Sequence, residues 1–280
     1  MADFLFNSPN NVSKFSTIIL KIIFMMNLTK TSNPVFKEGV FSKGYSSASE
    51  VMTINGTINK TALMLLLVIA AALFTWNKFF NAIAIDPNAG FSAVIPWLIV
   101  GGIGGFITVL VTVFRPQHSG VSAPVYAVFQ GLLLGGLSAI FESMYSGIVM
   151  RAVALTLAVF ATMLFLYRSG IIKVTRKFMM GVFAATAGIA MIYLISFIAG
   201  FFGAELSFLH GNSNFSIGFS LVIVAIAALN LVLDFSFIER AAKSGAPKYM
   251  EWYGAFGLMV TLIWLYLEIL RLLSKLASRN

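Results

Sequence analysis

The sequence predicts an all-α polytopic membrane protein, a bundle of seven transmembrane helices, and three observations carry that prediction. Of the 280 residues, 59% are hydrophobic and 10% are charged, whereas an average soluble domain has about 25% charged residues. The apolar residues gather into seven runs, each near the ~20 residues that a helix needs to cross a bilayer core. No stretch alternates like the strands of a membrane β-barrel. A soluble fold is therefore excluded.

The seven runs are separated by short connectors with helix-breaking residues, such as Asp86-Pro87-Asn88 and Arg115-Pro116-Gln117. The predicted spans are Thr61–Phe80, Val94–Phe114, Ser122–Phe141, Ile148–Tyr167, Phe178–Phe202, Ser216–Phe237 and Trp252–Leu273. They predict one membrane domain over residues 61–280.

Residues 1–60 differ in composition and are expected to form a flexible cytoplasmic tail, rich in Ser, Asn, Thr and Lys. Their one apolar segment, Phe15–Met26, is interrupted by Lys21 and is too short to span a bilayer. No small-residue cleavage site follows promptly, so a signal peptide is not favoured. Residues 1–25 are either part of the tail or an upstream extension, with Met25 or Met26 as the true start.

The positions of the basic residues predict the orientation. With seven spans, 14 of the 19 Lys and Arg residues fall on the side of the amino terminus and 5 on the other. Without the two tails, but with Lys60 kept, the ratio is 9 to 2. Cytoplasmic connectors carry the excess of positive charge, so we expect a cytoplasmic amino terminus in a cell membrane. Arg271, Lys275 and Arg279 then fall outside, which keeps a re-entrant last segment open as an alternative.

Two pairs of glycines are spaced four residues apart: Gly101 with Gly105 in the second predicted helix, and Gly131 with Gly135 in the third. No hydrophobic effect drives helices together in lipid, so small residues that allow close backbone approach stabilise helix pairs. Since these two helices form a hairpin, we expect them to pack on each other. A phosphate-binding loop is not favoured, because the required lysine and preceding strand are missing.

Asp234 lies late in the sixth predicted helix. Inserting a charged side chain at the centre of a membrane helix costs about 2.5 to 3.5 kcal/mol. Asp234 shares a helix face with Asn230 at a four-residue spacing, which predicts a polar stripe facing the bundle interior or a water-filled cavity. The functional hypothesis is a proton-sensing or ion-pathway carboxylate, with Arg115 as its counter-charge. The structural alternative is an acid at a helix end, paired with a base such as Arg240.

Glu268, in the seventh predicted helix, is the second such acid and is also a candidate for the proton sensor or ion pathway. Arg271 follows three residues later, close enough for an ion pair within the helix. That pair is the structural alternative to a functional role.

Neither an enzyme nor a cofactor site is indicated. The chain has no cysteine and two histidines, which disfavours a metal site, and it contains neither an H-E-x-x-H nor a G-x-S-x-G motif. No basic domain is present to bind nucleic acid. Ionised carboxylates are good calcium ligands, so calcium is a candidate only as a transported ion. The expected partner is the lipid bilayer.

Three segments carry a family resemblance, and the last is the most specific. They are MTINGTINKTALMLLLVIAAALFTW at Met52–Trp76, VFQGLLLGGLSAIFE at Val128–Glu142 and LNLVLDFSFIERAAKSGAPKYMEWYGAFGLMVTLIWLYLEILRLL at Leu229–Leu273. On these segments the sequence resembles the Bax-inhibitor (transmembrane Bax inhibitor motif) family, in particular its bacterial YccA-like branch.

The resemblance implies a central helix wrapped by six others, and a pH-sensitive calcium leak with two acids on the last two helices as proton sensor. The motifs LVLDF and LYLEILRLL place those acids at Asp234 and Glu268. This chain departs from the family pattern by having Glu at the second position. It also has Gly104-Gly105 where compact members carry an acid in the second helix.

The sequence therefore leaves two alternative functions open. The first is a proton-gated calcium leak. The alternative is a non-conducting regulatory or interaction protein that works with a membrane-bound protease in quality control, with the lysine-rich residues 27–60 as the contact. A secondary transporter is less favoured, because no inverted repeat is recognisable.

Overall fold

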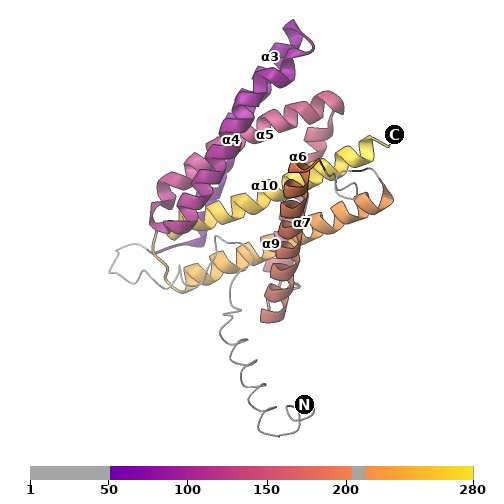
Figure 1. Ribbon diagram of the computed structural model, residues 1–280. Helices are drawn as coiled ribbons and strands as arrows, with labels where there is room; N and C mark the ends of the chain where they lie inside the picture. Colours follow the sequence, from indigo (N-terminus) through magenta and orange to yellow (C-terminus); the bar gives the residue numbers. More distant parts are fainter. Residues whose placement is uncertain (1–50, 204–210, 212, 280) are drawn as a thin grey trace, which may run out of the picture.

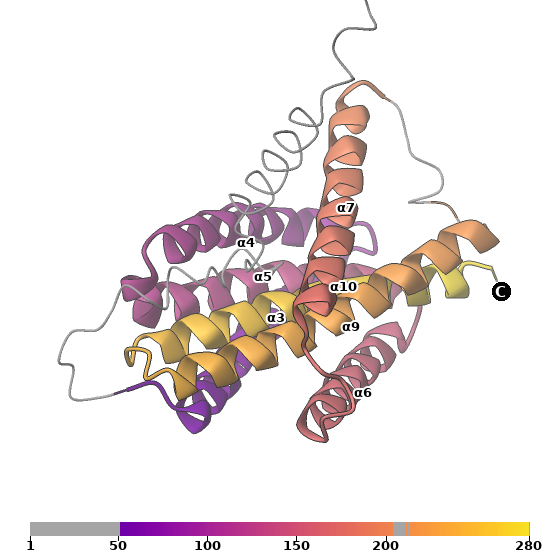
Figure 2. The ribbon, with the colours of Figure 1, turned by 90° about the horizontal axis from the view of Figure 1, so that it is seen from below.

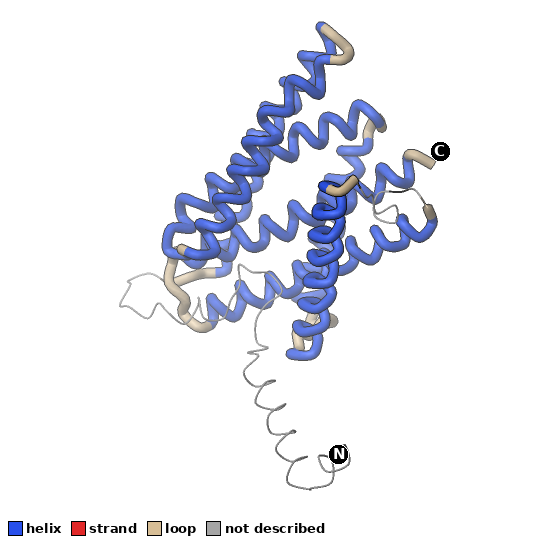
Figure 3. The backbone as a smooth tube through the Cα atoms, viewed as in Figure 1, coloured by secondary structure: helices blue, strands red, loops and turns tan. Residues whose placement is uncertain are grey.

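The computed structural model describes residues 51–203, 211 and 213–279, and seven helices in this part are long and apolar enough to cross a membrane. They are α3 (Ile54–Ile85), α4 (Ala89–Phe114), α5 (Ser119–Met144), α6 (Ile148–Arg168), α7 (Arg176–Phe201), α9 (Asn214–Lys243) and α10 (Met250–Ala277). A short 3-10 turn, η1 (Pro116–His118), joins α4 to α5. Figure 3 shows helices joined by short connectors throughout this part. The predicted all-α fold with seven spans is confirmed.

The first helix starts earlier than predicted, at Ile54 instead of Thr61. Thr53 caps it: its Oγ1 accepts a hydrogen bond from the amide of Gly56 at 2.9 Å, which satisfies one of the open N–H groups of the first turn. Helix α3 therefore begins seven residues before the predicted span. The rest of the tail, with its alternative start sites, lies outside the described residues.

The last helix, α10, is a single helix of 28 residues without a break, about 42 Å long at 1.5 Å per residue. This length is sufficient for a full span, and the structure therefore matches the seven-span alternative and not the re-entrant one.

Helix α10 is also the centre of the bundle. It packs against α3 and α5 on one side and against α6 and α9 on the other, and Figure 1 shows it running between the α3–α4–α5 group and α9. In the most apolar window of α9, 67% of residues are buried, and in that of α10, 56%, against 11% in α7. The outer helices thus expose apolar side chains, as lipid-facing helices do.

The helices alternate in direction, which gives the bundle two ends. We call the connector end the one that contains the start of α3, the η1 turn and the α9–α10 connector, residues 244–249. There the amide of Met52 donates to the carbonyl of Ala246 at 2.7 Å, and the hydroxyl of Ser119 donates to the carbonyl of Tyr249 at 2.9 Å. At the opposite end α9 begins and α10 finishes.

Gly101 and Gly105 lie where α4 touches α5, as expected. A Cβ atom added at Gly101 would lie 2.6 Å from the carbonyl oxygen of Phe129, and one at Gly105 would lie 2.5 Å from Nε2 of Gln130. At Gly101 the two backbones can approach this closely only because the position has no side chain, whereas Gly105 leaves room for the side chain of Gln130.

Gly131 and Gly135 have a different partner, and the expectation that they pack on α4 was wrong. A Cβ atom at Gly131 would lie 2.4 Å from the carbonyl oxygen of Val68, and one at Gly135 would lie 2.1 Å from that of Ala72, both on α3. Each residue turns a helix by about 100°, so positions 131 and 135 face away from the side of α5 that meets α4. The glycine pair of α5 thus allows close approach to α3, whereas Gly136 is the glycine of α5 that faces α4, at Leu98.

Helix α7 is held mainly by α9, and Figure 2 shows it standing steeply across the α9–α10 pair. Its polar contacts to that pair lie at seven-residue intervals. The sulfur of Met179 accepts from Arg240 at 3.6 Å, Oγ1 of Thr186 accepts from Asn230 at 2.8 Å, and Tyr193 donates to Glu268 at 2.8 Å. Within the described residues, these contacts attach α7 along one narrow face.

Candidate functional site

Asp234 is fully buried in the second half of α9, where the residues from Leu231 to Phe237 are all buried. It lies nine residues before the end of α9 at Lys243, which corresponds to about 14 Å along the helix axis. The carboxyl group is thus inside the span and not at its edge, in the helix pair that forms the core of the bundle. Polar groups in such places are costly and mark functional sites in membrane proteins.

The register between α9 and α10 places Asp234 and Glu268 apart. A Cβ atom added at Gly254 would lie 3.3 Å from Cγ1 of Ile238, and at the other end Lys275 bonds to Ser216 at 2.8 Å. In this antiparallel pair Asp234 therefore lies level with residue 258. Glu268 is ten residues further on, which corresponds to about 15 Å along the axis. A proton shared between two carboxyl groups requires direct contact, so this arrangement does not form one.

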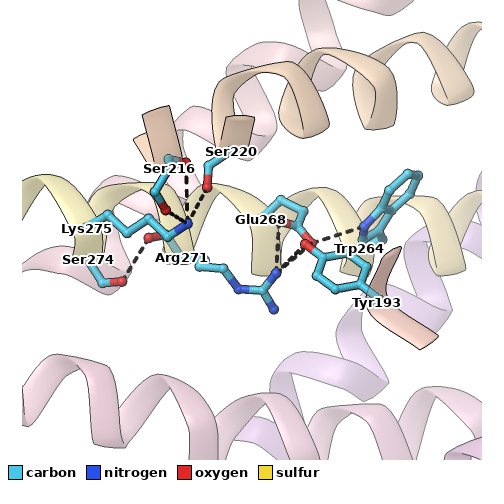
Figure 4. A network of polar contacts seen from close by, with 8 residues as sticks. All are labelled: Tyr193, Ser216, Ser220, Trp264, Glu268, Arg271, Ser274 and Lys275. Carbon is cyan, nitrogen blue, oxygen red and sulfur yellow. Dashed lines mark hydrogen bonds and ion pairs between the residues drawn. The ribbon is translucent and has the colours of Figure 1, made fainter. Parts of the chain in front are cut away.

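Glu268 has its own set of partners, drawn in Figure 4. Its Oε1 accepts hydrogen bonds from Tyr193 Oη at 2.8 Å, from Trp264 Nε1 at 3.2 Å and from Arg271 Nη1 at 3.1 Å. Arg271 also donates to the hydroxyl of Tyr193. The side chain of Glu268 is 2% exposed and that of Arg271 is 35% exposed. The intrahelical pair with Arg271 is thus present, and Tyr193 extends it to α7.

The other predicted polar residues surround Asp234 less closely than expected. Asn230 donates to Thr186 at 2.8 Å and to the carbonyl of Ile226 at 2.9 Å, and so contacts α7. Arg115 is exposed at the end of α4 and lines an open cavity of about 440 Å³. Arg240 donates to the carbonyl of Ser236 and lies 4.3 Å from the ring centre of Phe237. Within the described residues neither arginine forms an ion pair with Asp234.

The comparison with protein families agrees with this architecture. A family model described as Bax inhibitor 1 like matches residues 33–278, which include all seven described helices. The chain belongs to the Bax inhibitor 1 like family. A search among curated proteins gives no match, and neither does a search among solved structures.

The sequence interpretation of this Bax inhibitor 1 like protein missed Glu251, a fully buried acid at the start of α10. Its Oε1 accepts from the amide of Thr53 at 2.9 Å and from the hydroxyl of Thr53 at 2.8 Å. It also pairs with Lys60 and, at 3.4 Å, with Lys248. The only local signal was an acid in a first helical turn, a favourable place for a carboxylate. The main partners lie nearly 200 residues earlier in the chain.

A second buried charge was also missed. Lys275 was taken as part of the basic carboxy-terminal tail of this Bax inhibitor 1 like chain, but its side chain is 4% exposed. Its ammonium group lies between α10 and the start of α9. A spacing of seven residues from Glu268, which predicts the same helix face, was the signal that could have indicated burial.

The contact between α7 and α10 is testable in this Bax inhibitor 1 like protein. Replacing Tyr193 with phenylalanine should lower the free energy of unfolding by about 0.6 kcal/mol and at most about 1.7 kcal/mol, the measured mean and maximum for hydrogen bonds between membrane helices. The matched control is Tyr145→Phe, because within the described residues the hydroxyl of Tyr145 makes no hydrogen bond. Thermal unfolding in detergent measures both variants. Equal midpoints would show that Tyr193 does not hold α7.

Proposed function

We propose that this protein is a pH-sensitive calcium leak of the cell membrane, with Asp234 as the titrating group and the connector end in the cytoplasm. The observation that carries the proposal is the burial of the Asp234 carboxyl group about 14 Å inside the span, on α9, whose apolar window has the largest buried share among the described spans. Membership of the Bax inhibitor 1 like family supports it through the resemblance described above.

The orientation is supported by the distribution of charge. Nine basic residues lie at the connector end of the described part: Lys60, Arg115, Arg168, Lys173, Arg176, Lys177, Arg240, Lys243 and Lys248. Cytoplasmic connectors carry such an excess. This distribution favours an amino terminus in the cytoplasm, and the resemblance to a bacterial branch of the family favours a bacterial inner membrane.

Gating would follow from a change of charge at Asp234. Gain or loss of a proton there changes the charge buried between α9 and α10. If the closed and the open arrangement of these helices bind the proton with different affinity, a change in pH shifts the equilibrium between them. The ionised carboxylate is also a hard oxygen ligand suited to calcium. Glu268 acts separately in this scheme, since it is paired with Arg271 and Tyr193 near the opposite end.

Calcium flux into vesicles tests the proposal. Purified protein is reconstituted into vesicles that contain a calcium dye, and the rate of calcium entry is measured from about pH 5 to pH 8. We expect the wild-type rate to change by about fivefold or more over this range, a typical coupling between two sites. Asp234→Asn cannot titrate and should abolish most of that change.

The matched control is Asp86→Asn, the same substitution in the exposed connector after α3, which should keep the wild-type pH dependence. Glu268→Gln then shows whether the second acid contributes. A rate no higher than that of empty vesicles at every pH would overturn the proposal. It would favour the regulatory alternative, whose suggested contact in residues 27–60 lies mainly outside the described residues.

A further inference from the structure

The ammonium group of Lys275 is enclosed by oxygen atoms from one turn of α9. Its Nζ atom donates to Oγ of Ser216 at 2.8 Å, to Oγ of Ser220 at 2.8 Å and to the carbonyl oxygen of Ser216 at 3.5 Å. Both serines are buried, at 0% and 1% exposure. Figure 4 shows the lysine reaching from α10 across to these two serines, while Arg271 points away toward Tyr193.

The burial of this charge is unusual for its position. A lysine close to the end of a membrane helix normally extends its charge into water, and Lys275 is two residues from the end of α10. Burial of the ammonium group costs hydration energy. The dipole of α10 favours a cation in this last turn, whereas the first turns of α9, where Ser216 and Ser220 lie, form the positive end of the other dipole. The three oxygens of α9 therefore hold a charge that could otherwise reach water.

The serine oxygens and Asp234 lie along the same helix. Ser220 is fourteen residues before Asp234 on α9, about 21 Å along the axis, and both side chains are buried. The buried surface between α9 and α10 thus has an ammonium group near the opposite end of the bundle and a carboxyl group toward the connector end.

We propose that Lys275 is a tethered cation that closes the opposite end of the α9–α10 interface. The oxygens of Ser216 and Ser220 then form a cation site that the ammonium group occupies in the closed state. A mobile cation reaches these oxygens only when the lysine is displaced. The inference rests on the proposed function, because it assumes that cations pass along this interface.

Calcium flux in the same vesicles tests the closure. Lys275→Met removes the charge and keeps an unbranched side chain that is one atom shorter. We expect it to raise the calcium rate by about tenfold at each pH, because a unit charge near the path repels an approaching cation. The control is Arg279→Gln, which removes one charge at the same end from an exposed residue and should leave the rate unchanged. Lys275→Arg keeps the charge and should stay at the wild-type rate.

Cysteine labelling provides a measurement that does not depend on calcium conduction. The chain has no cysteine, so Ser220→Cys introduces a single thiol. With Lys275 present, its ammonium group occupies the site and repels a cationic methanethiosulfonate reagent, so labelling of this thiol should be slow. With Lys275→Ala as well, labelling should be at least about tenfold faster, although loss of the lysine also lowers the thiolate fraction. Lys275→Gln, which can still bond to both serines, replaces the Met variant if that variant does not elute as a folded monodisperse protein.

The outcomes separate this inference from the proposed function. Wild-type flux that depends on Asp234, with no increase in any neutral variant of Lys275, would overturn the inference and leave the function standing. A Lys275→Arg variant that conducts like Lys275→Met would also overturn it, because the effect would then come from packing and not from charge. Vesicles that pass no calcium at any pH would overturn the function. If Lys275 still protects the thiol from the cationic reagent in that case, the labelling would support the cation site.

Discussion

Glu251→Gln is expected to lower the free energy of unfolding by about 3 kcal/mol or more, the typical loss when one partner of a buried ion pair is removed. The glutamine would keep the volume of Glu251 but not its charge. The ammonium group of Lys60, on a side chain 19% exposed, would lose its counter-charge. The amide and hydroxyl of Thr53 both donate to Oε1 and could keep that acceptor, but the amide nitrogen of glutamine would then face the ammonium group of Lys60, donor against donor. Unfolding by heat or denaturant in detergent measures the loss.

The control is the same substitution at Glu239, near the end of α9. Glu239 pairs with Lys243 at 2.5 Å, and their side chains are 33% and 71% exposed. Exposed pairs are worth about 0 to 1 kcal/mol, so Glu239→Gln should cost much less. If both variants lose the same stability, Glu251 is not the anchor that joins α3 to α10.

Gly135→Val is expected to prevent normal packing of α3 on α5. The added Cβ atom would lie 2.1 Å from the carbonyl oxygen of Ala72 and 2.2 Å from Oγ1 of Thr75. A backbone atom cannot rotate away, so the two helices must separate along their contact. Overpacking typically costs about 1 to 3 kcal/mol, and here it acts on a backbone contact. We expect a lower unfolding midpoint and a smaller monodisperse fraction after extraction in detergent.

Gly102→Val is the matched control, since a Cβ atom at Gly102 would meet nothing within 4 Å. It introduces the same side chain in a neighbouring transmembrane helix and should leave the midpoint near that of the wild type. A Gly135→Val protein as stable as Gly102→Val would contradict the close approach of α3 and α5.

The sequence was sufficient to predict the helices because each span is a local signal. Apolar run length and breakers such as Asp86-Pro87 depend on neighbouring residues only, and they located all seven spans. The start of α3 was missed because its cap, Thr53, is stabilised by Glu251, which is 198 residues away in sequence. A local pattern contains no information about such a partner.

The candidate site was predicted less well, for a related reason. Asp234 and Glu268 were recognisable as acids inside spans, but whether they touch depends on the register of two antiparallel helices. That register is set by close contacts such as Gly254 against Ile238 and Lys275 against Ser216. Likewise, the spacing of Gly131 and Gly135 indicated close packing, but not that the partner is α3. Composition along one helix predicts a contact face, whereas the identity of the facing helix follows from the assembled bundle.

The attachment of the start of α3 has a mechanical consequence. The amide of Met52 is bonded to the carbonyl of Ala246, and Thr53 is bonded to Glu251, so the first described residues are tied directly to the turn from which the central helix starts. A tensile load applied to the chain before Val51 would reach that turn before it is distributed along α3. A force on the amino-terminal side of this protein would therefore act first on the start of α10.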